Sequence, residues 1–161
     1  KMALPPCHCT YTFVPFEDTK TLHVVMCIRS WDTFLGAPFN IASTALFLAI
    51  MARLAGYTPG TVNIQATNAH LYDNQFEVAQ EYISRPLHDS PKLVLSENIK
   101  PITSLSDIVG AFTRIQPQDI LLDNYVSEDK GQPYISFGQD KIFIKSNELN
   151  NNELKSIDFI F

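Results

Sequence analysis

The sequence predicts an α+β fold in which a mostly antiparallel or mixed sheet is packed by helices around one long buried helix. Two β-rich stretches, CHCTYTFVPF and TLHVVMCI, stand next to each other near the start of the chain. A long apolar segment follows them, and several short strand-like segments come later. The 161 residues are enough for one domain with a sizeable core.

The first two elements are predicted to form a hairpin. Pro5 and Pro6 precede the first β-rich stretch, in which Thr, Tyr, Phe and Val are frequent. Residues 17–20 are polar and form the predicted turn. The second stretch is therefore expected to run antiparallel to the first.

The next element is a helix over about residues 39–54. Gly36 and Pro38 break the chain before it, and Gly56 lies just past its end. Because the segment is apolar nearly all round, we expect it in the core or at a subunit interface. Its most apolar part, residues 45–52, is too short to cross a bilayer, so no membrane association is predicted.

The remaining chain alternates between shorter segments. Asp73 is expected to cap a helix that ends at about Ser84, before Pro86. A second helix is predicted over residues 104–113, and Pro59-Gly60 is predicted to be a turn. The predicted strands are TVNIQA, KLVL, DILLDNYV, PYISF and KIFIK, the last two around a Gly-Gln-Asp turn.

Composition excludes several functions. A net charge of -5 argues against a nucleic-acid surface, although one or two arginines could still bind a small anion. Three cysteines without secretory features indicate a reducing cytoplasm, which would be the host's if the source is a virus. The segment Cys7-His8-Cys9 predicts no metal site, because alternate residues of a strand point to opposite faces and no second ligand cluster follows.

Cys7 is the candidate nucleophile. It follows ALPP at the start of a strand, where a prolyl turn could present it at the edge of a pocket. A hairpin would return Arg29 close to Cys7, and its charge would stabilise the thiolate. The alternatives are a buried thiol for Cys7 and a surface ion pair for Arg29.

Three motifs resemble the thymidylate synthase family, in its phage type. MALPPCH, RSWDTFLGAPFNIAS and HLYDN occur in the family's order and at about its separations. The resemblance covers roughly residues 1–135 and is weak between residues 86 and 119. It implies that residues 1–137 are the carboxy-terminal catalytic portion of such an enzyme.

The resemblance implies a role for each matching residue. Cys7 would add to carbon 6 of uracil, and Arg29 and Ser30 would hold the nucleotide phosphate. Asn40 would pair with the 4-keto oxygen and the ring N–H of uracil. The remaining site residues would be His70 and Tyr72 at the sugar 3'-hydroxyl, Asp32 at the pterin and in the substrate site, and Gly36 beside the folate.

Each of these residues also has a structural alternative. Asn40 could cap the helix, and Asp32 could pair with Arg29. His70 and Tyr72 could be a packing pair on one face of a strand.

The implied activity is reductive methylation of deoxyuridylate (dUMP) to thymidylate with methylene-tetrahydrofolate and no metal. A dUMP hydroxymethylase, which quenches the intermediate with water, is an alternative. The cytidylate type would carry aspartate at Asn40 and is disfavoured. A non-catalytic subunit that binds a nucleotide or a protein partner is a further alternative, from a different class.

The chain also departs from the family pattern. Ile28 replaces a glutamine, Thr44 a tyrosine and Gln75 a histidine, while Ala66 and Thr67 replace two glycines. The family's long amino-terminal segment does not precede Cys7 in this sequence, so we expect an amino-terminal fragment or subunit as partner, within a dimer of the family type.

The carboxy-terminal end has two alternative interpretations. In the first, residues 138–161 extend the family fold and dock on the protein body. In the second, residues 138–155 are an insertion, and the apolar sequence IDFIF is the family's closing tail over the folate.

Overall fold

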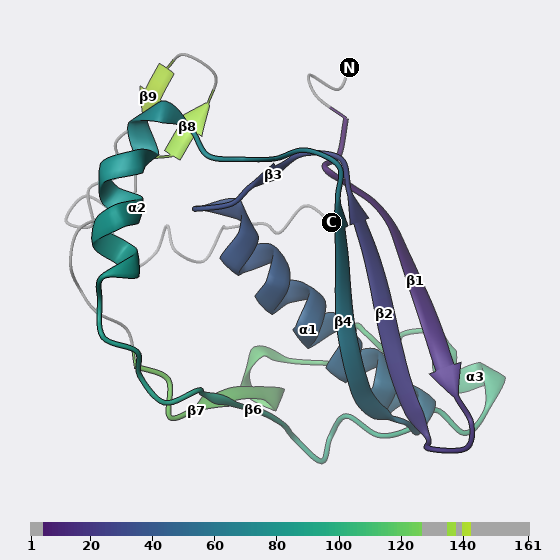
Figure 1. Cartoon of the computed structure of the whole chain (residues 1–161). Coiled ribbons are helices and arrows are strands. Elements are labelled where there is room, and N and C mark those ends of the chain that lie inside the picture. The colour runs from purple at the N-terminus through teal and green to yellow at the C-terminus, as the bar shows by residue number, and fades with distance from the viewer. Residues whose placement is uncertain (1–4, 127–134, 138–139, 143–161) are drawn as a thin grey trace. The chain divides into compact units, whose positions relative to one another are not determined.

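The computed structural model describes residues 5–126, 135–137 and 140–142. The chain divides into two compact units, and Figure 1 labels their helices and strands. The first unit contains Lys1–His70 and Pro86–Ser127, and the second contains Leu71–Arg85 and Glu128–Phe161. The division at residue 137 into a catalytic portion and an extension stays a prediction, and the predicted tail IDFIF lies outside the described residues.

The main sheet has the strand order β1-β2-β4. β1 (His8–Phe16) and β2 (Thr21–Ile28) are antiparallel, which confirms the predicted hairpin. β4 (Thr58–Ala66) runs parallel to β2, so the sheet is mixed.

The prediction that Pro59-Gly60 is a turn was wrong, because both residues lie inside β4. A proline is compatible with a strand at the edge of a sheet, where β4 lies. Gly60 is required there by close packing, since a Cβ atom would lie 2.7 Å from the ring of His23.

The predicted long helix is α1 (Gly36–Ala55), which begins three residues earlier than expected. Asp32 explains the early start, because its Oδ1 accepts hydrogen bonds from the N–H groups of Phe34 and Leu35, each at 3.0 Å. These bonds satisfy main-chain donors just before the helix. Gly56 ends the helix in the left-handed conformation (φ 75°), as its position in the sequence predicted.

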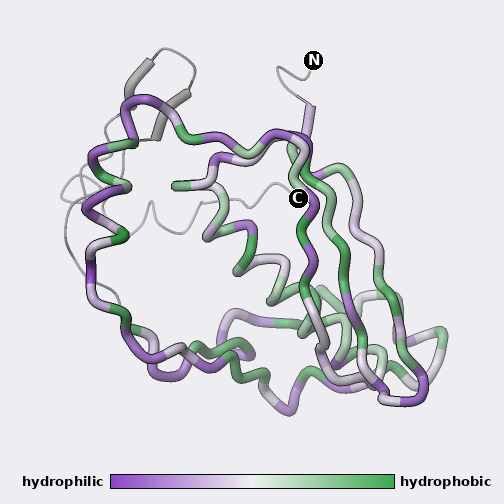
Figure 2. The backbone as a smooth tube through the Cα atoms, in the orientation of Figure 1, coloured by the Kyte–Doolittle hydropathy of each residue, from purple (hydrophilic) through white to green (hydrophobic). Residues whose placement is uncertain are grey.

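α1 is apolar all round because it packs on two sides. Leu48 and Ala52 contact Leu22 and Val24 of the sheet, with Tyr11, Phe13, Met51, Tyr57 and Val62 around them. Ile50 and Leu54 pack instead against a second cluster that includes Ile99 and Ala111. Figure 2 shows the apolar residues along the strands and the helix.

By length and composition alone, α1 could cross a membrane, in contrast to the prediction from residues 45–52. The core helix of a soluble protein passes the same test, and the packing of α1 on both sides is that of a core helix. Its first turns are the exception, because the side chain of Phe39 is 70% exposed.

The rest of the first unit covers the second side of α1. β6 (Lys92–Leu95) pairs antiparallel with β7 (Ile120–Asp123), so KLVL is a strand as predicted and DILLDNYV is one over a shorter range. The helix predicted over residues 104–113 is only α3 (Leu105–Ile108). Gly110, with φ +80°, has a left-handed backbone that cannot continue the helix.

Asp119, in the 3-10 turn η2 (Pro117–Asp119), is a buried polar anchor of this region. Its carboxylate accepts hydrogen bonds from the main-chain N–H of Gln116 and from Nδ2 of Asn98, both at 2.9 Å. These bonds, the Gln116 bond above all, lower the pKa of the Asp119 carboxyl.

The second unit contains a helix and a pair of antiparallel strands, both of which the sequence predicted. A 3-10 turn, η1 (Asp73–Gln75), leads into α2 (Phe76–Ile83), close to the predicted range. β8 (Ile135–Phe137) and β9 (Asp140–Ile142) pair antiparallel, and residues 138–139 of the predicted turn lie outside the described residues. Arg85 and Glu81 form a salt bridge of 3.1 Å just after α2.

Candidate active site

The hairpin brings Arg29 to the segment that carries Cys7. The main-chain N–H of Arg29 donates to the carbonyl oxygen of Cys7 at 2.9 Å. The guanidinium donates from Nε to the Pro6 carbonyl at 3.0 Å and from Nη2 to the Pro5 carbonyl at 2.6 Å. Arg29 therefore fixes the prolyl turn in front of Cys7.

The thiol of Cys7 is exposed, which excludes the alternative of a buried cysteine. Cys9 is also exposed, and its Sγ donates to the carbonyl of Cys7 at 3.6 Å. Cys27 is half-buried, and its Sγ donates to Oε1 of Gln65 at 3.3 Å. All three cysteines are free thiols.

Two short strands join the second and third motifs. β3 (Trp31–Asp32) pairs in parallel with β5 (Ala69–His70), with Asp32 opposite His70. The N–H and the hydroxyl of Thr33 both donate to the carbonyl of His70, each at 2.9 Å. Side chains that are 38 positions apart in the sequence thus come from one pair of strands.

Asn40 lies one turn inside α1, since the residue at the N-cap is Leu35. The capping alternative for Asn40 was therefore wrong. Its Oδ1 accepts a hydrogen bond of 3.1 Å from the indole Nε1 of Trp31. A Cβ atom on Gly36 would lie 3.4 Å from the Cβ of Asp32 and 3.6 Å from Oδ1 of Asn40, so this glycine leaves open the space between the two side chains.

The two remaining residues lie at the borders of these elements. Ser30 is half-buried between β2 and β3. His70 belongs to the first unit and ends β5, whereas Tyr72 belongs to the second unit, at the N-cap of η1. His70 and Tyr72 therefore do not lie on one strand.

Sequence reasoning missed two residues that support the site. Trp31 occupies a position that the family pattern leaves open, so the motif gave no signal for its bond to Asn40. Gln75 was noted only as a departure, yet it is buried and its Oε1 accepts from the N–H of Tyr72 at 3.1 Å. The signal for Gln75 was an uncharged polar residue directly before an amphipathic helix.

The other departures from the family pattern lie in the main sheet and in α1. Ile28 is buried in the sheet, opposite Ala66 in the register, and Thr67 donates its N–H to the Ile28 carbonyl at 3.0 Å. The residues that replace the two glycines thus extend the strand pairing. Thr44 is fully buried, and its Oγ1 has no hydrogen-bond partner among the described residues.

Two clefts lie near the carboxy-terminal half of α1. Those clefts, of about 570 and 580 Å³, are lined in part by Leu54 and Arg114 and by Arg53 and Tyr57, respectively. None of the predicted site residues lines either of them.

Comparison with known proteins decides the family. A sequence profile described as thymidylate synthase matches residues 1–136. The chain belongs to the thymidylate synthase family. Thymidylate synthase from Pseudomonas putida is 35% identical over 126 residues, which are 78% of this chain and 39% of that protein. The Listeria monocytogenes enzyme is 41% identical over 124 residues, or 77% of this chain and 36% of that protein.

The fold agrees with this assignment. The crystal structure of thymidylate synthase from T4 phage matches with a TM-score of 0.70 and 34% identity, over 82% of this chain and 47% of that chain. This confirms the predicted α+β fold class. The chain spans about two fifths of the length of the curated relatives that it matches.

Proposed function

We propose that this chain carries the nucleophile and the nucleotide-binding residues of a thymidylate synthase, which converts dUMP to thymidylate with methylene-tetrahydrofolate. The observation that carries the proposal is the arrangement of Cys7 and Arg29. The exposed thiol stands at the start of β1, and Arg29 holds the two residues before it through their carbonyl groups. The family membership of the chain supports the same reaction.

In this proposal Cys7 provides covalent catalysis. Its sulfur adds an electron pair to carbon 6 of uracil, and the electrons of the 5,6 double bond move to carbon 5 and the 4-keto group. Carbon 5 thereby becomes the nucleophile that takes up the one-carbon unit of the folate, and it loses its proton. The bond between sulfur and carbon 6 breaks, and the 5,6 double bond forms again, when a hydride completes the methyl group. The positive charge of Arg29, together with Ser30, favours binding of the dianionic phosphate.

Asn40, His70 and Tyr72 hold the rest of the nucleotide. The Asn40 side chain offers both a donor and an acceptor, which match the carbonyl and N–H of the uracil edge. His70 and Tyr72 bind the 3'-hydroxyl of the sugar. The bond from Tyr72 N–H to Gln75 supports this role, because it fixes the backbone of Tyr72.

Asp32 and Gly36 face the folate, which supplies the one-carbon unit and the hydride. The fit is supported by the open space at Gly36, next to Asp32 and Asn40. Asp32 has one oxygen bonded to two main-chain N–H groups, so its carboxylate is held in one orientation. A carboxylate fixed in this way suits the N–H groups of a pterin ring.

We also propose the assembly that the family resemblance implies. An amino-terminal portion of the fold, in the same or another chain, would complete the enzyme, and two copies would pack sheet to sheet in the cytoplasm. The face of the main sheet that points away from α1 supports this, because it exposes Val14 and Phe16. Residues 1–137 would form the catalytic portion.

The test is formation of a covalent complex with 5-fluoro-deoxyuridylate and methylene-tetrahydrofolate, followed by peptide mapping. We expect the adduct on Cys7, its loss in Cys7→Ser and its retention in the matched control Cys27→Ser. An adduct on Cys9 or Cys27 in the active complex would contradict the proposal. With dUMP as substrate, a hydroxymethyl product would identify the hydroxymethylase instead, and nucleotide binding without turnover would identify a binding subunit.

A further inference from the structure

The hydrogen bond between Trp31 and Asn40 restricts the orientation of the Asn40 side-chain amide, which faces the base in the proposed function. The Nε1–H of Trp31 lies 3.1 Å from Oδ1 of Asn40, in a partly buried position. An indole N–H can only donate, and an amide group has one end that only accepts and one that only donates. The bond therefore requires the oxygen of Asn40, and not its nitrogen, on the side of Trp31.

Fixing the oxygen also fixes the nitrogen of the amide. Rotation of the amide by 180° would replace Oδ1 by Nδ2 and place two donors against each other. The bond would be lost at a position where both groups are partly shielded from water. Asn40 therefore has one stable arrangement of donor and acceptor.

This restriction bears on the choice of base. Uracil presents an acceptor at position 4 and a donor at position 3, and cytosine presents the reverse. One amide can match either edge, but only if it rotates between the two arrangements. We propose that Trp31 is a positioning residue that holds Asn40 in the arrangement for uracil and so excludes deoxycytidylate (dCMP). The inference rests on the proposed function, since it needs Asn40 at the base.

The sequence allows a selective test, because Trp31 is the single tryptophan of the chain. Trp31→Phe keeps an aromatic ring and removes the donor. Global replacement of tryptophan by its benzothiophene analogue, which has sulfur in place of the indole N–H, alters the same position with nearly unchanged shape. Tyr57→Phe is the matched control, because it removes an aromatic donor at the opposite end of the sheet.

The measurement is the ratio of dUMP to dCMP affinity, by calorimetry on the chain in its native assembly. We expect both Trp31 replacements to lower the ratio about tenfold, or about 1.4 kcal/mol, and Tyr57→Phe to leave it unchanged. In an Asn40→Ala background, Trp31→Phe should cause no further change in the ratio, because it acts through Asn40.

The outcomes separate the inference from the proposed function. If the native chain prefers dUMP and the benzothiophene variant keeps the native ratio, the inference is wrong and the proposed function stands. An equal loss of affinity for both nucleotides would also overturn it, since a purely structural residue acts in that way. If the native chain shows no preference for dUMP, the proposed function itself fails.

Discussion

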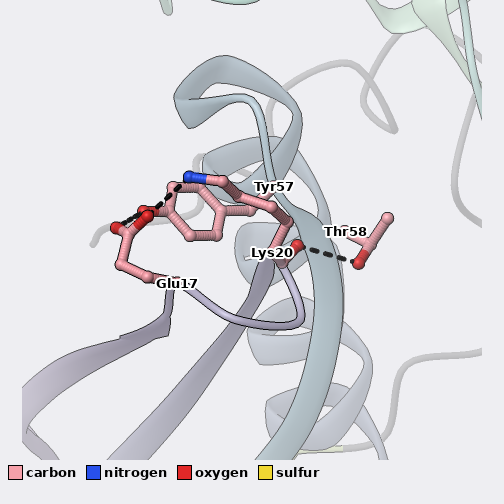
Figure 3. Close-up of polar contacts among 4 residues, drawn as sticks. All are labelled: Glu17, Lys20, Tyr57 and Thr58. Atoms are coloured by element: carbon pink, nitrogen blue, oxygen red, sulfur yellow. Dashed lines mark hydrogen bonds and ion pairs between the residues drawn. The ribbon is translucent and has the colours of Figure 1, made fainter.

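The two ends of the β1–β2 hairpin use their polar residues in different ways. At the turn, Lys20 Nζ binds Glu17 Oε2 at 2.5 Å, and the Tyr57 hydroxyl donates to Glu17 Oε1 (Figure 3). The carbonyl of Lys20 accepts from the N–H and hydroxyl of Thr58 at 2.8 and 3.0 Å. Opposite charges are paired here, and the cluster joins the turn to the start of β4.

At the other end of the hairpin, which carries Cys7 and Arg29, the charged side chain binds the main chain instead. The guanidinium of Arg29 donates to two prolyl carbonyls and forms no salt bridge within the described residues. The charge of Arg29 therefore remains available to an anion, whereas that of Lys20 is neutralised by Glu17. A charged side chain can thus be held in place without losing its charge. A site that binds an anion needs a cation of this kind, held by carbonyl groups and not by a carboxylate.

The largest expected effect on activity comes from replacing the cation at each end of the hairpin by glutamine. Arg29→Gln should lower kcat/KM for dUMP on the order of 100-fold, because it removes a phosphate ligand and releases the turn before Cys7. Lys20→Gln, the matched control, should leave kcat/KM near the native value. Steady-state kinetics of both variants checks this, and equal losses would show that the two ends do not differ.

A substitution at Asn40 sharpens the functional side of the comparison. Asn40→Asp can donate a proton to the ring nitrogen of cytosine and should shift preference from dUMP towards dCMP. The shift should be about 1–3 kcal/mol, as is typical when a buried polar group loses its partner. An unchanged ratio of kcat/KM for the two substrates would remove Asn40 from base selection.

Thr44 differs from the polar residues of both ends, because its buried Oγ1 has no hydrogen-bond partner in the part of the chain that the structure describes. Thr44→Val keeps the shape of the side chain and removes the unpaired hydroxyl, so it should raise the free energy of unfolding by about 1 kcal/mol. Urea denaturation monitored by circular dichroism checks this. A loss of stability would mean that the hydroxyl has a function in the assembled protein.

The smallest effect concerns the pH dependence of the turn. The bond to Glu17 raises the pKa of Tyr57, so the stability it contributes is present below the ordinary tyrosine range and is lost as the pH rises through the raised pKa. Lys20, and then Tyr57, lower the pKa of Glu17, whose contribution is lost as the pH falls through the lowered pKa. Tyr57→Phe should reduce the alkaline loss without removing it, because Glu17 also raises the pKa of Lys20, whose contribution is lost as the pH rises through that raised pKa. Melting temperatures from pH 5 to 11 check this, and an unchanged alkaline loss in Tyr57→Phe would contradict the assignment to Tyr57.

Local patterns in the sequence predicted the elements whose cause is local. The β-rich stretches predicted the hairpin, and Gly56 predicted the end of α1. Proline and glycine predicted a turn at residues 59–60, where contact with His23 and an edge position favour a strand. The helix over residues 104–113 was predicted too long, because Gly110 adopts a left-handed backbone that local propensity does not specify.

The sequence predicted which residues belong to the candidate site, but only some of the contacts between them. Closeness of Arg29 to Cys7 follows from a hairpin, so it could be inferred from spacing. The bond of Trp31 to Asn40 could not, because it depends on how a two-residue strand meets the first turns of a helix. The pairing of Asp32 with His70 is likewise a long-range contact that no local pattern encodes.

The most direct test of the contrast between the two ends is hydrogen–deuterium exchange of the native assembly with and without dUMP. We predict slower exchange in peptides that cover residues 29–40 and 68–70, and unchanged exchange at residues 17–20 and 57–58. Protection at the turn, or none at residues 29–40 under saturating dUMP, would contradict the account.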